Sequence, residues 1–392
     1  MFFRKKIQVF GVIRLFLILT VTFCIFTNNL IGAEEEVLYP LLSPDSQVEN
    51  IIFLIGDGMG LSQITSARIA NYGADKRLNI EKMPVTGLIN THSSNDLITD
   101  SGAAGTALAT GYKTNNGMIS VSPDGKRLRT ILEACRDIGM SSGLVVTCTI
   151  THATPAVFAS HVMSRNDEAT IASQLLENKV NVMLGGGRMF FLPESEPGSK
   201  RHDERNLLVE AQKKGYLYIQ TKEELGESRG NYILGLFQLG HLTTIPPEPS
   251  LGEMTDKAIE LLRKNRKGFF LMVEGSQIDW ACHDNDTDNT IRQTLLFDEA
   301  VKVALDFALE NKHTLVLVTA DHECGGMGIN SGSLDGKELS IGWTTKGHSG
   351  VPVPVYAFGP QAERFMGLKD NTEIPRIFAE LLGIESFHIM SE

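Results

Sequence analysis

Four short clusters of acidic, histidine and hydroxyl side chains carry the chemistry that this chain could perform. The first is Thr-Asp-Ser-Gly at residues 99–102, which contains a possible nucleophile, Ser101. The other three clusters are rich in carboxylates and imidazoles and lie at residues 274–283, 319–323 and 347–350. Oxygen and imidazole donors of this kind are what hard and borderline divalent cations require. The clusters therefore predict a metal centre beside a serine.

The candidate ligands in these clusters have the spacing that a shared metal centre needs. Asp279 and His283 are four residues apart, so a helix would place both on one face. Asp321 and His322 directly follow an apolar run that resembles a strand, and only 26 residues separate His322 from His348. One such pair alone is more often a solvated surface pair, but three clusters together are an improbable coincidence.

Ser101 precedes a run of small residues, 102–107, that predicts the start of a helix. The amides of that first turn could bind an anion, although a plain helix-capping role for Ser101 is an equal alternative. No base lies next to Ser101 in the sequence. Because a serine hydroxyl has a high pKa, it needs activation, and direct coordination to a metal would supply it.

Three further residues become candidates only in the company of these clusters. Asp57, in Gly-Asp-Gly, could be a turn or capping aspartate, and the loop around it lacks the Gly-Lys-Ser/Thr of a nucleotide-binding loop. Arg165 could clamp two phosphate oxygens, or it could form a surface salt bridge with Asp167. His348 could be an ordinary loop histidine, but its short connection can return it to the same crevice.

Apolar runs alternate with helical patterns along most of the chain. Such alternation predicts an α/β fold with a mostly parallel central sheet and helices on both faces. The predicted strands are residues 50–55, 143–149, 180–184, 269–273, 315–319 and 353–358. The predicted helices are residues 61–72, 127–138, 168–178, 204–214, 252–266, 287–311 and 372–382. The polar stretch 193–249 is interpreted as surface elaboration.

The polar clusters follow predicted strands, which is where such a sheet binds ligands. Asp57 follows the first strand, His152 and Thr154 follow the second, Glu274 follows the fourth and Asp321 the fifth. We therefore expect these side chains to meet at one edge of the sheet.

The N-terminus has the pattern of a secretory signal. Four basic residues and no acidic residue precede a mostly apolar run of twelve, 15–26, and Ala33 offers a cleavage site. An uncleaved membrane anchor is the alternative, but about 20 apolar residues are needed to span a bilayer. We expect a signal peptide at 1–33, an N-terminal segment at 34–49, one catalytic domain at 50–392, and a periplasmic or secreted enzyme.

Charge and cysteine content narrow the class of protein further. The formal net charge is −11, and removal of residues 1–33 would make it −15, which argues against nucleic acid as a partner. Four cysteines would remain after cleavage: Cys135, Cys148, Cys282 and Cys324. One or two disulfides, with Cys282–Cys324 the more interesting pair, and buried free thiols are both open.

From about residue 50 to residue 359 the chain resembles the alkaline phosphatases. The resemblance is carried by Asp-Ser-Gly-Ala, Glu-Gly-x-x-Ile-Asp-x-x-x-His, Thr-Ala-Asp-His and Gly-His-Ser, in the order of that family. It implies hydrolysis of phosphate monoesters through a phosphoserine on Ser101, with Arg165 binding the phosphate. It also implies a homodimer. The short apolar run separately predicts no stable membrane span after cleavage of the signal.

The same resemblance implies three metal sites. Asp57, Asp321, His322 and the Ser101 oxygen would bind one zinc ion, and Asp279, His283 and His348 would bind a second. Asp57, Thr154 and Glu274 would bind a third ion, usually magnesium. His152 stands where some members have aspartate, which would favour zinc or cobalt at this third site. Trp280 stands where some members have lysine or histidine, which predicts weaker retention of phosphate.

The family often carries an insertion before its last histidine, which forms a crown over the dimer. The short spacing before His348 predicts a small crown here. Two other functions compete with a phosphomonoesterase. A phosphodiesterase of the same superfamily would use the same two metals, but Thr154 and Glu274 favour the monoesterase. A metal-binding protein that has lost catalysis is the second, and the intact nucleophile argues against it.

Overall fold

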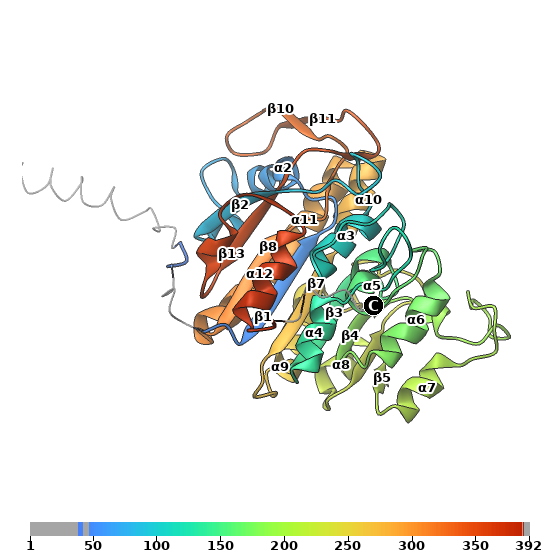
Figure 1. Ribbon diagram of the computed structural model, residues 1–392. Helices are drawn as coiled ribbons and strands as arrows, with labels where there is room; N and C mark the ends of the chain where they lie inside the picture. Colours follow the sequence, from blue (N-terminus) through green and yellow to red (C-terminus); the bar gives the residue numbers. More distant parts are fainter. Residues whose placement is uncertain (1–37, 42–46, 386, 388–392) are drawn as a thin grey trace, which may run out of the picture. The chain divides into compact units, whose positions relative to one another are not determined.

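A ten-stranded sheet forms the centre of the structure, a computed structural model that describes residues 38–41, 47–385 and 387 (Figure 1). Its strand order is β14-β2-β13-β8-β1-β7-β3-β4-β6-β5. Among these ten strands only β13 runs antiparallel to its neighbours, β2 and β8. The mostly parallel sheet that the sequence predicts is therefore confirmed. The strands are β1 Asn50–Gly56, β2 Val85–Asn90, β3 Ser141–Thr149, β4 Val182–Gly186, β5 Leu217–Ile219, β6 Ile233–Leu236, β7 Phe269–Gly275, β8 Thr314–Thr319, β13 Val353–Phe358 and β14 Gly367–Asp370.

Helices cover both faces of this sheet (Figure 1). One layer contains α2 and α9, each of which packs against α11, and the other contains α3, α4, α5 and α12. The helices are α2 Leu61–Tyr72, α3 Ser101–Thr110, α4 Ile131–Asp137, α5 Ala153–Ala159, α6 Glu168–Glu177, α7 Leu207–Lys213, α8 Lys222–Glu227, α9 Leu251–Leu262, α10 Gln277–Asp284, α11 Thr287–Glu310 and α12 Glu373–Leu381.

The central strands are apolar along most of their length because both of their faces are buried. All seven residues of β1 and of β7, and all six of β8, are buried. Phe53 of β1 packs against Phe158 of α5 and Phe378 of α12, with ring centroids 6.2 and 5.3 Å away. Truncation of such a ring to alanine typically costs about 3–5 kcal/mol. This packing fixes the strand ends that carry the polar clusters.

Two short pairs of strands lie outside the main sheet. One is the hairpin of β10 (Gly328–Gly332) and β11 (Leu339–Gly342), which occupies most of the short connection before His348. The other pairs β9 (Glu323–Cys324) with β12 (His348–Ser349) in antiparallel fashion. His348 thus lies on a strand pair, whereas the sequence analysis placed it in a loop.

One sequence interpretation is wrong. Part of the stretch 193–249 belongs to the sheet, because β6 pairs with β4 and β5 pairs with β6. All four residues of β6 are buried, but the strand is so short that its apolar pattern does not stand out from the polar residues around it. Strands β2 and β14 also escape the sequence analysis. β2 alternates buried and exposed residues, which weakens its apolar pattern.

The predicted signal peptide 1–33 lies outside the described residues. Within the part of the chain that is described, no helix is both long enough and apolar enough to cross a bilayer. The four cysteines Cys135, Cys148, Cys282 and Cys324 are free and buried, so the free-thiol alternative holds in this structure.

Candidate active site

The candidate site lies at the carboxyl ends of four neighbouring strands, β8, β1, β7 and β3. Asp57 follows β1, Glu274 is the penultimate residue of β7, and Asp321 follows β8 by two residues. In the register of the sheet, Ile55 is opposite both Glu274 and Thr319, so the strands end nearly level. The sequence rule that polar clusters gather at this edge is therefore confirmed by the topology.

Asp279, His283 and His348 come together as one group of donors. Asp279 and His283 lie on the same face of α10, as their spacing predicts, and the Nε2 atom of His283 is 3.2 Å from Asp279 Oδ2. The Nε2 atoms of His283 and His348 are 3.2 Å apart. Both rings donate their Nδ1 hydrogen to a backbone carbonyl, that of Lys346 and that of Thr99. The two Nε2 atoms therefore face each other, and that of His283 also faces Asp279, so the contact needs a proton or a metal cation between the rings.

A second group of donors surrounds Ser101. The Nε2 atom of His322 lies 3.3 Å from Ser101 Oγ, 3.2 Å from Asp321 Oδ2 and 3.5 Å from Asp57 Oδ1. A general base in a Ser-His-Asp triad would face the serine with one ring nitrogen and the acid with the other. Here serine and acids face the same nitrogen, and His322 Nδ1 has no hydrogen-bond partner. The arrangement is that of a cation site with a serine oxygen on its edge.

The residues predicted for the third site share two features. Asp57, Thr154 and Glu274 are fully buried, and an oxygen of each has no hydrogen-bond partner. The sulfur of Cys148 lies 3.4 Å from Glu274 Oε2. Donor atoms of Cys148, His152 and Glu274 lie within 4.8 Å of one another, so a nitrogen and a sulfur border this site.

Burial and mutual repulsion shift the carboxyl groups of this region. Burial, together with the negative charges of Asp321 and Asp279, raises the pKa of Asp57 well above its usual range. Burial also raises the pKa of Glu274 to about 7. The hydrogen bond with Asp279 raises the pKa of His283 to about 9. Divalent cations bound among these groups would stabilise the ionised carboxylates.

The buried oxygens test whether cations fit here. Both carboxylate oxygens of Asp57, and one oxygen each of Glu274, Asp279 and Asp321, are buried without a hydrogen-bond partner. Buried polar atoms in folded proteins are otherwise nearly always paired, and an unpaired one costs about 1–3 kcal/mol. The donor set of carboxylate, imidazole and hydroxyl groups therefore fits divalent cations.

Arg165 reaches the nucleophile from a separate loop. Its Nη1 atom donates to Asp100 Oδ2 at 2.9 Å, and its Nη2 atom lies 3.3 Å from His152 Nε2. The salt bridge with Asp167 is thus not the contact that this arginine makes. Burial and the neighbouring Arg165 charge lower the pKa of His152 to about 3, so its ring is neutral and can accept a hydrogen bond or bind a cation.

Sequence reasoning missed two participants. Asp100 was only a neighbour of the nucleophile, whereas it caps α3 through Ala103 N and holds Arg165. His241 carried no signal, since it lies in an irregular stretch between β6 and α9. Its ring centroid is 4.5 Å from that of Trp280 and 5.9 Å from that of His152. Trp280 therefore belongs to an aromatic cluster beside the third site.

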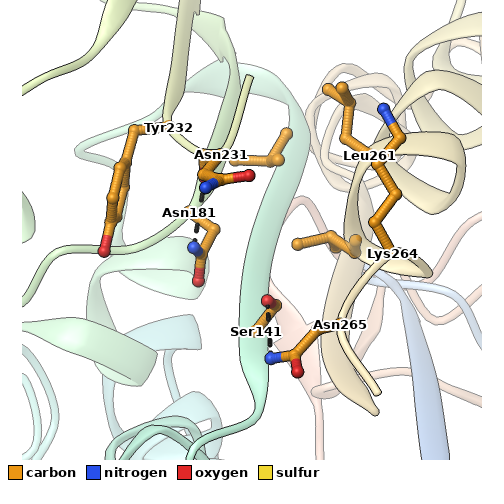
Figure 2. Close-up of a pocket in the computed structure, with 9 residues that line it drawn as sticks. Ser141, Asn181, Asn231, Tyr232, Leu261, Lys264 and Asn265 are labelled. Atoms are coloured by element: carbon orange, nitrogen blue, oxygen red, sulfur yellow. Dashed lines mark hydrogen bonds between the residues drawn. The ribbon is translucent and has the colours of Figure 1, made fainter. Parts of the chain in front are cut away.

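A pocket far from this chemistry lies at the opposite edge of the sheet. Figure 2 shows Ser141, Asn181 and Asn231 among the residues that line it, at the amino ends of β3, β4 and β6. The cavity has a volume of about 300 Å³. Its asparagines are engaged: Asn181 Nδ2 donates to the carbonyl of Asn231 at 3.1 Å, and Asn265 Nδ2 to Ser141 Oγ at 3.0 Å. No carboxylate or imidazole is among its lining residues, so we do not assign the chemistry to it.

Comparison with known proteins agrees with this geometry. A sequence model of the alkaline phosphatase family matches residues 48–338 and 333–384. Alkaline phosphatase 4 of Bacillus subtilis is 35% identical, over 86% of this chain and 89% of that protein. Alkaline phosphatase of Escherichia coli is 33% identical, over 91% of each.

Solved structures show the same likeness. The alkaline phosphatase of the Antarctic bacterium TAB5 has a TM-score of 0.78 and 32% identity, over 86% of this chain and 98% of that one. The Thermus thermophilus alkaline phosphatase has a TM-score of 0.79 and 27% identity, over 91% and 95% of the two chains. The family match covers far more than half of the chain and includes every candidate site residue. The chain therefore belongs to the alkaline phosphatase family and is a metal-binding hydrolase of phosphate monoesters.

Proposed function

We propose that this enzyme hydrolyses phosphate monoesters through a covalent phosphoserine on Ser101. The observation that carries the proposal is the position of Ser101 Oγ, 3.3 Å from His322 Nε2 and among carboxylates with unpaired buried oxygens. Ser101 is the first residue of α3, whose N-terminal dipole favours an anion. A phosphate bound there would also lie near Arg165, which Asp100 links to the start of the same helix.

Three cation sites accompany this nucleophile in the proposal. Two zinc ions would be held by Asp57, Asp321 and His322 and by Asp279, His283 and His348. Asp57, Thr154 and Glu274 would hold a third ion. Magnesium is the usual choice of the family, and a mutant of the TAB5 enzyme has magnesium in its M3 site. His152 and Cys148 at this site favour zinc or cobalt instead. When bound, such cations stabilise developing negative charge and make serine or water a better nucleophile at neutral pH.

The side chains of this chain then have separate roles. Arg165 binds two nonbridging oxygens of the phosphoryl group through its guanidinium fork. The Ser101 hydroxyl gives its proton to water, its oxygen attacks phosphorus in line with the leaving group, the ester P–O bond breaks, and the departing oxygen takes a proton from water. In the second half, water attacks the phosphoserine, the bond to Ser101 Oγ breaks, and inorganic phosphate leaves. His283 and His348 are kept in one tautomer by their backbone acceptors, so their Nε2 atoms stay available.

The contacts above all address the phosphoryl group, so we infer a broad specificity for the rest of the ester. A phosphodiesterase is the competing function. The unpaired Thr154 and Glu274 oxygens favour the monoesterase, since the third site serves the additional nonbridging oxygen of a monoester. Comparison of kcat/KM on nitrophenyl phosphate and on a bis-nitrophenyl diester tests this, and a higher value on the diester would refute the monoesterase.

Replacement of the nucleophile tests the proposal itself. In Ser101→Ala we expect kcat for nitrophenyl phosphate to fall by at least about 10³-fold, as for other enzymes that lose a nucleophile. The metal content measured by mass spectrometry should stay within one ion per chain of the unaltered enzyme. Ser331→Ala, an exposed position of β10, is the matched control and should change neither value. Near-normal turnover in Ser101→Ala would exclude the phosphoserine.

We also infer that residues 1–33 form a cleaved signal and that the mature enzyme acts in the periplasm or outside the cell. The basic N-terminus, the apolar run and Ala33 support this assignment. N-terminal sequencing of the exported protein tests it, with Glu34 as the expected first residue. The family resemblance further supports a homodimer, which sedimentation of the purified enzyme would detect.

A further inference from the structure

Cys324 lies directly beside the donor group of Asp279, His283 and His348. It is opposite His348 in the antiparallel pair of β9 and β12, so both side chains project to the same side. One donor atom from each of the four residues, including the Cys324 sulfur, lies within 4.8 Å of the other three. The cysteine is fully buried and forms no disulfide.

A buried thiol can be mere packing, so an independent sign of a ligand matters. The Cys324 sulfur makes one weak contact, with the backbone carbonyl of Asp279 at 3.6 Å. Beside it lies Asp279, which is only 5% exposed, and its Oδ1 atom is buried without a hydrogen-bond partner. The Nε2 atoms of His283 and His348 face each other at 3.2 Å, an arrangement that a shared cation would stabilise. These three atoms point to a cation within reach of the sulfur.

We propose that Cys324 is a fourth protein donor to the cation bound by Asp279, His283 and His348. The inference rests on the proposed function for the existence of that cation, and it adds sulfur to an otherwise oxygen and nitrogen site. Sulfur donors select borderline and soft cations such as zinc, cobalt and cadmium over magnesium. The site should therefore bind cadmium more tightly than a site without the thiol would.

A second cysteine, Cys148, borders the third site and supplies the comparison that the test needs. Its sulfur lies 3.4 Å from Glu274 Oε2, on the other side of the cation cluster. A third cysteine, Cys282, is buried and contacts Thr290 and Gln63, outside both donor groups. Cys282→Ser is therefore the matched control for Cys324→Ser, and Cys148→Ser separates a sulfur signal of the third site from one of this site.

Substitution with cobalt detects a bond between sulfur and the metal directly, without a measurement of turnover. The metal-free full chain is loaded with Co²⁺, and the near-ultraviolet sulfur-to-cobalt charge-transfer band is recorded for the unaltered enzyme and the three variants. We expect the band in the unaltered enzyme and in Cys282→Ser, and a clear loss of intensity in Cys324→Ser. No band in the unaltered enzyme, or full intensity in Cys324→Ser with loss in Cys148→Ser, would overturn the proposal.

Two further measurements keep the test decisive. If Cys324→Ser does not fold, X-ray absorption of zinc-loaded Cys148→Ser should still show sulfur at about 2.3 Å from zinc, and its absence overturns the proposal. In competition titrations, Cys324→Ser should lose affinity for Cd²⁺ relative to Zn²⁺ by about tenfold or more, and an unchanged ratio contradicts the assignment. Hydrolysis of nitrophenyl phosphate by the zinc-loaded enzyme is scored separately, so loss of the proposed function and loss of the sulfur assignment are distinguishable.

Discussion

Arg165 is held by Asp100, whose Oδ2 atom accepts a hydrogen bond from Arg165 Nη1 at 2.9 Å. The other oxygen of the same carboxylate accepts from Ala103 N, also at 2.9 Å, and so caps α3. Although burial opposes it, the hydrogen bond from Ala103 and the Arg165 charge lower the pKa of Asp100. One ionised side chain therefore fixes the guanidinium relative to Ser101, the first residue of that helix.

Asp100→Asn separates these two roles. Asparagine caps a helix about as well as aspartate, so the stability of α3 should be retained. The charged contact to Arg165 is lost, and we expect the inhibition constant of inorganic phosphate to rise about tenfold, since such contacts contribute roughly 1.5–3 kcal/mol. The control is Asp167→Asn, which alters the cap of α6 but not the Arg165 contact. An unchanged phosphate inhibition constant in Asp100→Asn would show that Asp100 does not position Arg165.

Trp280→Lys tests the role of the aromatic cluster. Trp280 packs against His241 and His152, with ring centroids 4.5 and 6.0 Å away, and carries no charge toward the phosphate. A lysine there would add a cation that supports phosphate, so we expect tighter product binding and a lower phosphate inhibition constant. Trp280→Met, which is apolar and flexible, should leave that constant closer to its original value. Equal constants for the lysine and methionine variants would dismiss the hypothesis.

Removal of the metals should reverse the sign of the effect that Asp57→Asn has on the melting temperature. In metal-free protein the Asp57 carboxyl is buried beside Asp321, and burial raises its pKa. Asparagine has the same shape without the charge, so Asp57→Asn should raise the melting temperature of the chelator-treated enzyme. In zinc the same variant should melt below the unaltered enzyme, because cations that bind the folded state stabilise it.

Calorimetry of the unaltered enzyme and of Asp57→Asn, with chelator and with zinc, measures these melting temperatures. Asn50, a buried polar residue of β1 that bonds Thr314, provides a control outside the cation cluster. Asn50→Asp should lower both melting temperatures. A metal-free Asp57→Asn that melts below metal-free unaltered enzyme would mean that Asp57 does not repel its neighbours.

Glu133 predicts a pH effect on stability away from the active site. Burial alone would raise its pKa, but hydrogen bonds from His161 and Thr130 N and the charge of Arg127 outweigh burial and lower it to about 2. Because the folded pKa lies below the ordinary value of 4.5, this stabilisation is present above pH 4.5 and is lost as the pH falls toward 2. The shift corresponds to about 3 kcal/mol at most.

Glu133→Gln should therefore destabilise the enzyme by up to about 3 kcal/mol at pH 7 and by less than half of that near pH 3. Urea denaturation of both proteins from pH 3 to pH 7 measures the difference. Glu223→Gln, at an exposed position, is the control and should give no pH-dependent difference. A constant difference across this pH range would contradict the assigned cause.

The sequence predicted the strand ends well because long buried strands such as β1 and β7 are continuous apolar runs. The four-residue spacing of Asp279 and His283 also sufficed to place them on one helix face, in α10. The contact of Asp100 with Arg165 could not be predicted from the sequence, because the two residues are 65 positions apart and only the fold brings them together. The backbone carbonyls that orient His283 and His348 leave no side-chain signal at all. Strand β6 was hidden because only four buried residues stand in a polar stretch.

The covalent role of Ser101 is the central claim, and it can be measured directly. Zinc-loaded enzyme is mixed with a phosphate monoester at acidic pH, quenched in acid and digested, and the peptide that contains Ser101 is analysed by mass spectrometry. We expect this peptide to gain one phosphoryl group, with the modification on Ser101 and absent from Ser101→Ala. Steady hydrolysis with no phosphorylated peptide under any quench condition would contradict the account.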